Sequence, residues 1–307
     1  MAKKNPDQKI LLMTDTASDI PDEALADGGI VMLPIPIAVD GVGYLERVDF
    51  TPTEFYEIIT RAKELPTTSH ILSVTYQQAY QDAFEAGYTH VINNTITSKG
   101  SNMFQAAVQG KRQFYGENPG AQDQMQITVL DSGTYTLGYG QPIMDAAQMI
   151  REGATAEEVT AWLDDCFSCT EILFASYSLE YAKRSGRIPA AAAFVGDVLG
   201  LRPVISIIDG TTTVVEKVRG DKNVAIRIAE NALKRAVDKK SVTAIVYGAV
   251  DQYGEDLTRE LSRRFSRVPK VRYHVGAAIT INSGPKVVGV AYRGEKRLNT
   301  RAREQDF

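Results

Sequence analysis

The segment from Thr97 to Asn102 joins a β-rich run to a helical run and carries several side chains that could bind an anion. It presents the hydroxyls of Ser98 and Ser101, the amide of Asn102 and the ammonium group of Lys99. A strand–loop–helix turn also leaves unpaired backbone N–H groups at the first helical turn, and these groups attract anions. The segment therefore predicts either an anion-binding turn or a helix cap without a ligand.

Similar side chains follow other predicted elements. Ser18 and Ser132 each follow a predicted strand, and Thr68 and Ser69 lie in a hydroxyl-rich connector after a helical run. The carboxyl ends of parallel strands share one edge of an open α/β sheet, and ligands bind at that edge. We therefore expect these side chains to converge with Ser101.

An enzymatic site is the alternative interpretation of this cluster. His70 follows Thr68 and Ser69 and could act as a base, while Asp15 and Asp131 end strands and could assist it or bind a metal. The chain has no phosphate-binding loop, dinucleotide fingerprint, zinc-protease helix or nucleophile elbow. A hydroxyl cluster without a clear base favours binding over nucleophilic catalysis. We therefore expect no catalytic residue, metal or cofactor, and keep a hydrolase or phosphotransferase as the alternative.

The bulk properties exclude several classes of partner. A formal net charge of -4 over 307 residues gives no electrostatic reason to expect nucleic acid. No apolar run approaches the length of a membrane span, and no apolar segment of a secretory signal follows the N-terminus. Cys166 and Cys169 form a C-x-x-C on a helical pattern, which favours a core helix in a reducing compartment. We expect a cytoplasmic protein without stable membrane insertion.

Hydrophobic periodicity divides the chain into two halves. In the first half, helical runs such as 53–64 and 76–86 separate expected strands at 9–14, 30–39, 90–96 and 126–130, and this alternation predicts a parallel sheet. The second half mixes helices at 224–239 and 255–265 with expected strands at 171–178, 203–209, 211–218, 242–250, 270–281 and 287–292.

Two turn signals support antiparallel pairing in the second half. Asp209-Gly210 predicts a hairpin, and Asn282-Ser283-Gly284-Pro285 predicts a second turn between strands. We predict an N-terminal parallel-sheet α/β domain over 1–170 and a C-terminal mixed-sheet α+β domain over 171–307. The charged tail after Gly294 is expected to fray.

An ordered set of motifs resembles the DegV family over nearly the whole chain. Residues 14–21 (TDTASDIP) resemble the family's "TDSTADLP", and 49–52 (DFTP) with Phe55-Tyr56 resemble its "D-x-T-P-x-x-F-Y". The further matches are Thr68-Ser69 to "TSQPS", 97–101 to "SSxLS", 179–188 to "L-x-x-L-x-x-GGRI" and 201–204 to "IKPI".

The resemblance implies a DegV-like fold of two α/β domains with a long-chain fatty acid between them. Such a carrier presents the ligand's carboxylate to a separate fatty-acid kinase, which makes the acyl phosphate for phospholipid synthesis. The implied carboxylate-binding residues are Thr68, Ser69, Ser101, Asn102 and Asn282. Ser18, Arg187 and Arg202 are implied as further contacts of the site or of the partner. A regulatory protein with a structural lipid is a third hypothesis.

The chain departs from the family pattern at a few positions. Asn282 occupies the place of a histidine, and Ser185 replaces the first glycine of "GGR". Asparagine can form hydrogen bonds but does not titrate. The apolar segment 190–201 is expected either to line the acyl-chain tunnel or to form an ordinary core helix.

Overall fold

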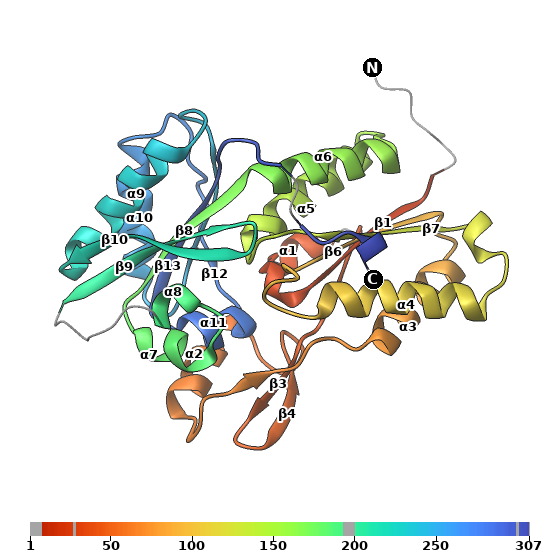
Figure 1. The fold of residues 1–307 in the computed structure, drawn as a ribbon, viewed down its shortest axis with the longest axis horizontal. Coiled ribbons are helices and arrows are strands. Elements are labelled where there is room, and N and C mark those ends of the chain that lie inside the picture. The colour runs from red at the N-terminus through yellow and green to blue at the C-terminus, as the bar shows by residue number, and fades with distance from the viewer. Residues whose placement is uncertain (1–7, 27–28, 193–199, 299–300, 307) are drawn as a thin grey trace.

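Two lobes, each built around its own β-sheet, make up the computed structural model, which describes residues 8–26, 29–192, 200–298 and 301–306. Figure 1 shows a four-stranded sheet in the lobe at the right and a six-stranded sheet in the lobe at the left. A three-stranded sheet lies below them. The predicted fold class is therefore confirmed as a parallel-sheet half followed by a mixed-sheet half.

The four-stranded sheet is parallel throughout. Its strand order is β2 (Ile30–Leu33), β1 (Ile10–Asp15), β6 (His90–Thr95) and β7 (Gln126–Asp131). The helices that cover it are α3 (Ser73–Glu85), α4 (Met103–Glu117), α5 (Leu137–Arg151) and α6 (Ala156–Cys169). Figure 1 shows α3 and α4 on one face, with α5 and α6 on the other. Because both faces are covered, β1 begins with four apolar residues, Ile10–Met13, and every residue of the strand is buried.

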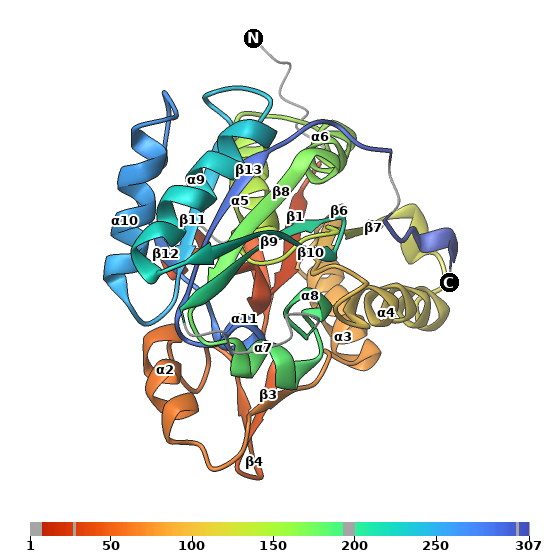
Figure 2. The ribbon, with the colours of Figure 1, turned by 60° about the vertical axis from the view of Figure 1, so that its left-hand side comes forward.

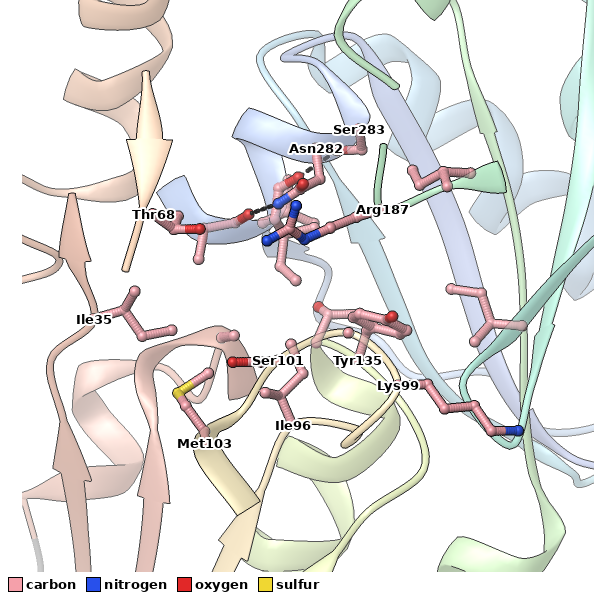
Figure 3. Close-up of a pocket in the computed structure, with 18 of the residues that line it drawn as sticks. Ile35, Thr68, Ile96, Lys99, Ser101, Met103, Tyr135, Arg187, Asn282 and Ser283 are labelled. Atoms are coloured by element: carbon pink, nitrogen blue, oxygen red, sulfur yellow. Dashed lines mark hydrogen bonds between the residues drawn. The ribbon is translucent and has the colours of Figure 1, made fainter. Parts of the chain in front are cut away.

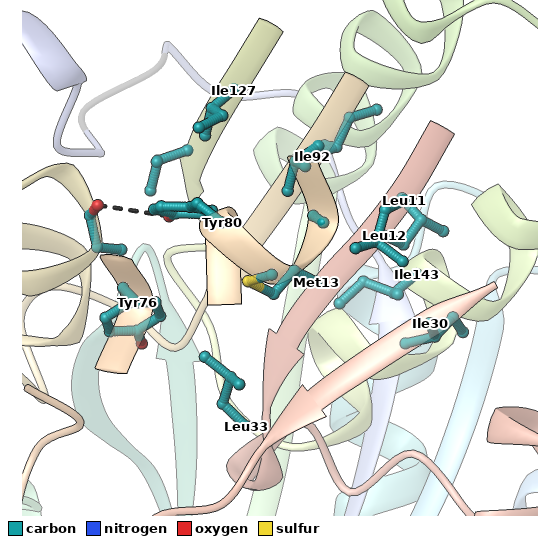
Figure 4. Packing of buried hydrophobic residues seen from close by; sticks show 14 of the residues in the cluster. Leu11, Leu12, Met13, Ile30, Leu33, Tyr76, Tyr80, Ile92, Ile127 and Ile143 are labelled. Atoms are coloured by element: carbon teal, nitrogen blue, oxygen red, sulfur yellow. Dashed lines mark hydrogen bonds between the residues drawn. The ribbon is translucent and has the colours of Figure 1, made fainter. Parts of the chain in front are cut away.

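The core of this lobe gathers around the central strands. Figure 4 shows Leu12 and Met13 of β1 among Ile92 of β6, Tyr80 of α3 and Ile143 of α5. All five side chains are fully or almost fully buried. The strand ends that carry the polar loops are therefore attached to a closely packed support.

The six-stranded sheet separates a closed core from an inner face. Its order is β10 (Thr211–Arg219), β9 (Leu201–Ile208), β8 (Thr170–Ser176), β13 (Val287–Arg293), β11 (Val242–Tyr247) and β12 (Tyr273–His274). Helices α9 (Val224–Arg235) and α10 (Asp251–Ser262) cover one face (Figure 2). Leu173 and Ala175 of β8 pack in the core that includes these helices, whereas Ile172 and Phe174 belong to the cluster on the other face. Alternate residues of one strand thus build two different environments.

The hairpin predicted at Asp209-Gly210 is confirmed between β9 and β10. Both turn residues have positive φ, 47° at Asp209 and 72° at Gly210, which is the combination a two-residue hairpin favours. A side chain at position 210 would also collide with the Thr97 hydroxyl in the loop after β6. The turn therefore brings the second lobe against the first.

The strand expected over 30–39 is wrong as a single element. It divides into β2 and β3 (Pro36–Val39), and β3 belongs to the small sheet with β4 (Val42–Leu45) and β5 (Thr67–Thr68). Pro34 and Pro36 explain the break, since each removes a backbone donor and restricts the preceding residue. Helix α2 (Pro52–Arg61) then begins at a Thr51–Glu54 capping box.

The strand expected over 270–281 is also wrong. Only Tyr273–His274 are strand, and Ala277–Ser283 form helix α11, so the segment Asn282–Pro285 is a helix end and not a turn between strands. Ile279 and Thr280 favour a strand locally, but carboxylates of the other lobe accept hydrogen bonds from the first backbone N–H groups of α11. Tertiary capping therefore overrides local propensity.

The tail expected to fray returns to the first lobe. Glu304 accepts a hydrogen bond from the Val129 backbone N–H at 2.7 Å and forms an ion pair with Lys111. The Ala302 backbone N–H donates to the Asp131 carboxylate at 3.1 Å. Residues 301–306 are therefore anchored beside β7, at the edge of the four-stranded sheet.

Candidate functional site

A cavity of about 640 Å³ lies between the lobes. Its size falls in the range typical of small-molecule sites. Polar lining residues come mainly from loops and helix ends, and Figure 3 shows Thr68, Asn282 and Arg187 across the opening from Ser101 and Tyr135. The apolar lining includes Ile172, Phe174, Ile207, Val246 and Val287, all on strands of the six-stranded sheet.

The small three-stranded sheet positions Thr68 and Ser69. Thr68 is paired with Ile37 of β3, and the Ser69 backbone N–H donates to the Pro36 carbonyl at 2.9 Å. Both side chains line the cavity. Neither hydroxyl has a hydrogen-bond partner within the described parts of the chain, so both can contact a ligand.

The loop between β6 and α4 positions Ser101 and Asn102. The Asp131 carboxylate holds this loop by accepting hydrogen bonds from the Ser98 backbone N–H at 3.0 Å and from the Ser98 hydroxyl at 2.6 Å. A side chain on Gly100 would come within 2.5 Å of the Tyr135 hydroxyl oxygen, so the loop packs directly on that ring. Asn102 precedes α4 without capping it through its side chain. Ser101 and Asn102 therefore face the cavity at a helix start.

Helix α11 supplies Asn282 and Ser283 from the second half of the chain. The Asn282 amide nitrogen donates to the Ala278 carbonyl at 2.7 Å, and the Ser283 hydroxyl donates to the Ile279 carbonyl at 2.9 Å. These bonds direct both side chains along their own helix. Asn282 keeps its amide oxygen and a second N–H for a ligand.

Two cationic side chains also line the cavity. Arg187 is exposed and donates weakly to the Ser185 carbonyl at 3.4 Å. The Lys99 ammonium group donates to the Thr211 hydroxyl at 3.1 Å and so links the two lobes. Burial raises the pKa of the neighbouring Tyr135 to about 12, against the opposing effect of Arg187. The polar part of the cavity therefore presents neutral donors and positive charge, a combination that suits an anion.

Two serines expected to converge with Ser101, and one of the two arginines given as possible site or partner contacts, lie outside the cavity lining. Ser18 is fully buried, and its hydroxyl lies 3.6 Å from the Met32 sulfur. Ser132 is also buried and donates to a backbone carbonyl two residues away. Arg202 forms an ion pair with Asp221 at 2.9 Å. Both serines follow strands as expected, but the Ser18 hydroxyl faces Met32 and only that of Ser132 bonds within its own turn, and none of the three residues lines the cavity.

The carboxylates of the enzymatic alternative are also not in the cavity lining. Asp15 accepts hydrogen bonds from the Tyr139 hydroxyl at 2.7 Å and the Ile96 backbone N–H at 3.0 Å. Burial raises the pKa of Asp15 to about 6. Asp131 holds the β6–α4 loop, as described above. Of His70, Asp15 and Asp131, only His70 lines the cavity. A site that combines His70 with either carboxylate is therefore not formed there.

Two further expectations concern the cysteine pair and the apolar segment 190–201. Cys166 and Cys169 are free thiols on α6, and burial raises the pKa of Cys166 to about 12. Within the segment expected to line a tunnel, Ala190 and Ala191 pack in the inner-face cluster, whereas residues 193–199 lie outside the described residues.

Sequence reasoning missed Tyr135 and Ile35, which both line the cavity. Tyr135 follows the Asp131-Ser132-Gly133 strand end, and that position was the available signal.

The fold and the cavity define a class of two-lobed α/β proteins with a ligand-sized space between a parallel and a mixed sheet. The sequence model described as "Uncharacterised protein, DegV family" matches residues 9–295. The chain therefore belongs to the DegV family, as its motifs indicated.

Relatives and solved structures match almost end to end. A DegV domain-containing protein of Clostridium perfringens is 30% identical over 293 residues, covering 94% of this chain and 99% of the relative. One from Caldanaerobacter subterraneus is 28% identical over 286 residues, covering 93% and 99%. A DegV family protein from Thermus thermophilus, described for its fatty-acid binding, superposes with a TM-score of 0.82 at 27% identity, covering 94% and 100%. A stearic acid-binding protein from Eubacterium ventriosum gives 0.83 at 24% identity, covering 93% and 98%, and supports the fold.

The described residues contain neither a membrane-spanning helix nor a cluster of metal ligands. None of the helices in these parts of the chain combines the length and hydropathy needed to cross a bilayer. Likewise, these residues contain no group of three or more His, Cys, Asp or Glu side chains that could hold a metal ion.

Proposed function

We propose that this protein binds a long-chain fatty acid in the cavity between its lobes and presents the carboxylate to a partner fatty-acid kinase for acyl-phosphate formation. In this proposal an N-terminal domain over 1–170 supplies most carboxylate-facing loops, and a C-terminal domain over 171–307 receives the acyl chain, although residues 301–306 return to the first lobe. The observation that carries the proposal is one continuous cavity with free hydroxyls among its polar residues and an apolar β-sheet face. The fatty-acid-binding protein of Thermus thermophilus has the same fold.

The apolar sheet face supplies most of the affinity. Burial contributes about 0.8 kcal/mol per methylene group, so a C16 chain gains roughly 11 kcal/mol before the entropy costs of binding. Each head-group hydrogen bond contributes about 1–3 kcal/mol. The chain therefore determines whether the ligand binds, and the head group determines its orientation.

The carboxylate meets donors from both halves of the protein. The hydroxyls of Thr68 and Ser101 have no competing protein partner among the described residues. Asn102 lies at the start of α4, where the backbone N–H groups of the first helical turn attract an anion. Ser69 and Asn282 complete the polar lining, while Arg187 contributes positive charge at the opening. The carboxylate end is therefore the end that a partner can reach.

Extraction and mass spectrometry of the purified protein test the binding step. We expect a fatty acid of roughly C14–C18, or uptake of added palmitate or oleate after delipidation, because buried methylene groups favour retention. Methyl palmitate is the matched control, since it keeps the chain and removes the charge. Absence of lipid together with failure to take up palmitate or oleate would overturn the proposal.

A reconstituted phosphorylation assay tests the presentation step. A fatty-acid kinase with ATP should form acyl phosphate from the palmitate-loaded protein, and the loaded protein with ATP alone should not. Turnover by the protein alone that is lost in His70→Ala would instead support the hydrolase or phosphotransferase alternative.

A further inference from the structure

Helix α11 begins against two buried carboxyl groups from the other half of the chain. The Gly276 backbone N–H donates to Asp19 Oδ1 at 2.7 Å, and the Ala278 N–H donates to Glu46 Oε1 at 2.9 Å. Asp19 follows β1 and Glu46 follows β4, more than 230 residues away in sequence. Both carboxyls are almost completely inaccessible to solvent. The start of α11 is therefore tied to the N-terminal half.

Gly276 lets the two carboxyl groups approach the same point. A methyl group added to Gly276 would lie 2.6 Å from Glu46 Oε1 and 2.8 Å from Asp19 Oδ1. The backbone φ of Gly276 is −73°, which any residue can adopt. Glycine is therefore required at this position for space and not for conformation. The two carboxyl groups act as one pair around it.

The carboxyl pair lies directly behind the cavity wall. The other oxygen of Asp19 accepts from the Thr136 hydroxyl, and Thr136 lines the cavity. The other oxygen of Glu46 accepts from the Thr16 hydroxyl at 2.6 Å, and Thr16 in turn accepts from the Ile35 N–H at 3.1 Å. Ile35 and Ala278 also line the cavity. Both carboxyls thus connect α11 to fixed parts of the first lobe.

We propose that Asp19 and Glu46 are positioning residues that anchor the start of α11 and thereby hold Asn282 in the fatty-acid head-group site. This inference rests on the proposed function, because that function assigns Asn282 to the carboxylate. Neither acid touches the cavity itself. They act through the helix, which carries Asn282 and the cavity-lining Ser283 on its last turn.

The charged and titratable surroundings make this anchor sensitive to pH. Asp15 of β1 adds negative charge near Glu46, whereas Arg47 faces Asp19 and is also paired with Asp22. Tyr139 of α5 and Tyr56 of α2 lie close enough for Asp19 to raise their pKa values. Burial, together with the charge of Glu46, raises the pKa of Asp19 to about 8, and burial also raises that of Glu46. Asp19 therefore keeps a proton at neutral pH and loses it as the pH rises past about 8.

Hydrogen exchange of the ligand-free protein tests the anchor without relying on lipid binding. Glu46→Ala should speed amide exchange in residues 276–283 by about tenfold, as expected for the loss of one buried hydrogen bond. Glu46→Gln keeps an acceptor for the Ala278 N–H and should stay close to wild type. Amide hydrogen exchange of residues 276–283, corrected for the intrinsic effect of pH, should accelerate between pH 6 and 9 in wild type, because the acids then ionise side by side. The double variant Asp19→Asn/Glu46→Gln cannot ionise at these positions and should show no such acceleration. Equal exchange in Glu46→Ala and wild type would overturn the anchor.

Palmitate binding tests the consequence for the site. Glu46→Ala and Gly276→Ala should each weaken palmitate binding by about tenfold, while Glu46→Gln and the exposed control Glu57→Gln should not. Gly276→Ala keeps both acids and fills only the space between them. If Glu46→Ala does not fold, Gly276→Ala is the variant that tests the positioning role. If wild type binds palmitate and Gly276→Ala binds it equally well, the positioning role is wrong. If wild type does not bind palmitate, the proposed function fails while the exchange result still decides the anchor.

Discussion

The two kinds of cavity lining differ in how their side chains are held. Ile172, Phe174, Val246 and Val287 project from strands whose opposite face is a closed core against α9 and α10. Thr68 and Ser101 instead lie at a two-residue strand and a loop, with hydroxyls that have no partner among the described residues. Under the proposed function this difference divides the work: the sheet face supplies the affinity, and the polar loops orient the head group.

A charge on the sheet face should have the largest effect. Ile207→Asp places a carboxylate in the apolar lining, and we expect palmitate binding to weaken by at least about a hundredfold, because an unpaired buried charge costs several kcal/mol. Titration with a fluorescent fatty acid measures the loss, and Val42→Asp on the exposed face of β4 is the matched control. Circular dichroism establishes that both variants are folded. Unchanged binding in a folded Ile207→Asp variant would place the chain elsewhere.

Removal of the two unpartnered hydroxyls should have an intermediate effect. Thr68→Ala combined with Ser101→Ala is expected to weaken retention or handover of the ligand by about thirtyfold, since each hydroxyl contributes one hydrogen bond of about 1 kcal/mol. The melting temperature should change little, because neither hydroxyl bonds to the described protein. Thr67→Ala, on the exposed neighbour of Thr68, is the control. A double variant that matches wild type in both retention and handover would show that the head group lies elsewhere.

The buried acids predict a pH dependence of stability that the sheet face cannot produce. The pKa of Asp19 rises from 3.8 to about 8 on folding, so between these values the folded state binds a proton that the unfolded state has released. Stability should therefore fall as the pH rises from 5 to 8. Thermal unfolding at several pH values measures this slope, which Asp19→Asn should reduce. A slope that is the same in wild type and Asp19→Asn would contradict the assignment.

The smallest effect on affinity is expected at Asn282. Asn282→His should change palmitate affinity by only a few fold, because one head-group hydrogen bond contributes about 1 kcal/mol against roughly ten from the chain. The substitution should introduce pH dependence between about pH 6 and 8, where histidine titrates, and should alter handover to a kinase more than affinity. Binding at several pH values together with a phosphorylation assay makes the comparison. A hundredfold change in affinity with unchanged handover would show that this role of Asn282 is wrong.

Prediction from sequence succeeded where the signal was local. The strands β1, β6 and β7 follow from continuous apolar or β-rich runs, and the hairpin at Asp209-Gly210 follows from its turn residues. The sequence predicts Ser101 after a strand and Thr68 in a hydroxyl-rich connector, the family motifs indicate both for the site, and both line the cavity. Fatty-acid binding by these residues remains a prediction.

Prediction failed where side chains with similar local signals had different tertiary partners. Ser18 and Ser132 follow strands just as Ser101 does, but their hydroxyls point into turns and the core. Arg187 and Arg202 looked equivalent in sequence, and only Arg187 lines the cavity, because Asp221 pairs with Arg202. The direction of a side chain at a strand end depends on which neighbours fill the space around it.

The sequence by itself determined the family, the two sheets and the supply of hydroxyls at strand ends, because periodicity and turn chemistry act over a few residues. Tertiary structure alone decided that residues 277–283 form a helix and that this helix faces the cavity. Its first backbone N–H groups are satisfied by Asp19 and Glu46 from the other end of the chain. No local pattern can reveal a cap supplied from more than 230 residues away, since only folding brings the two segments together.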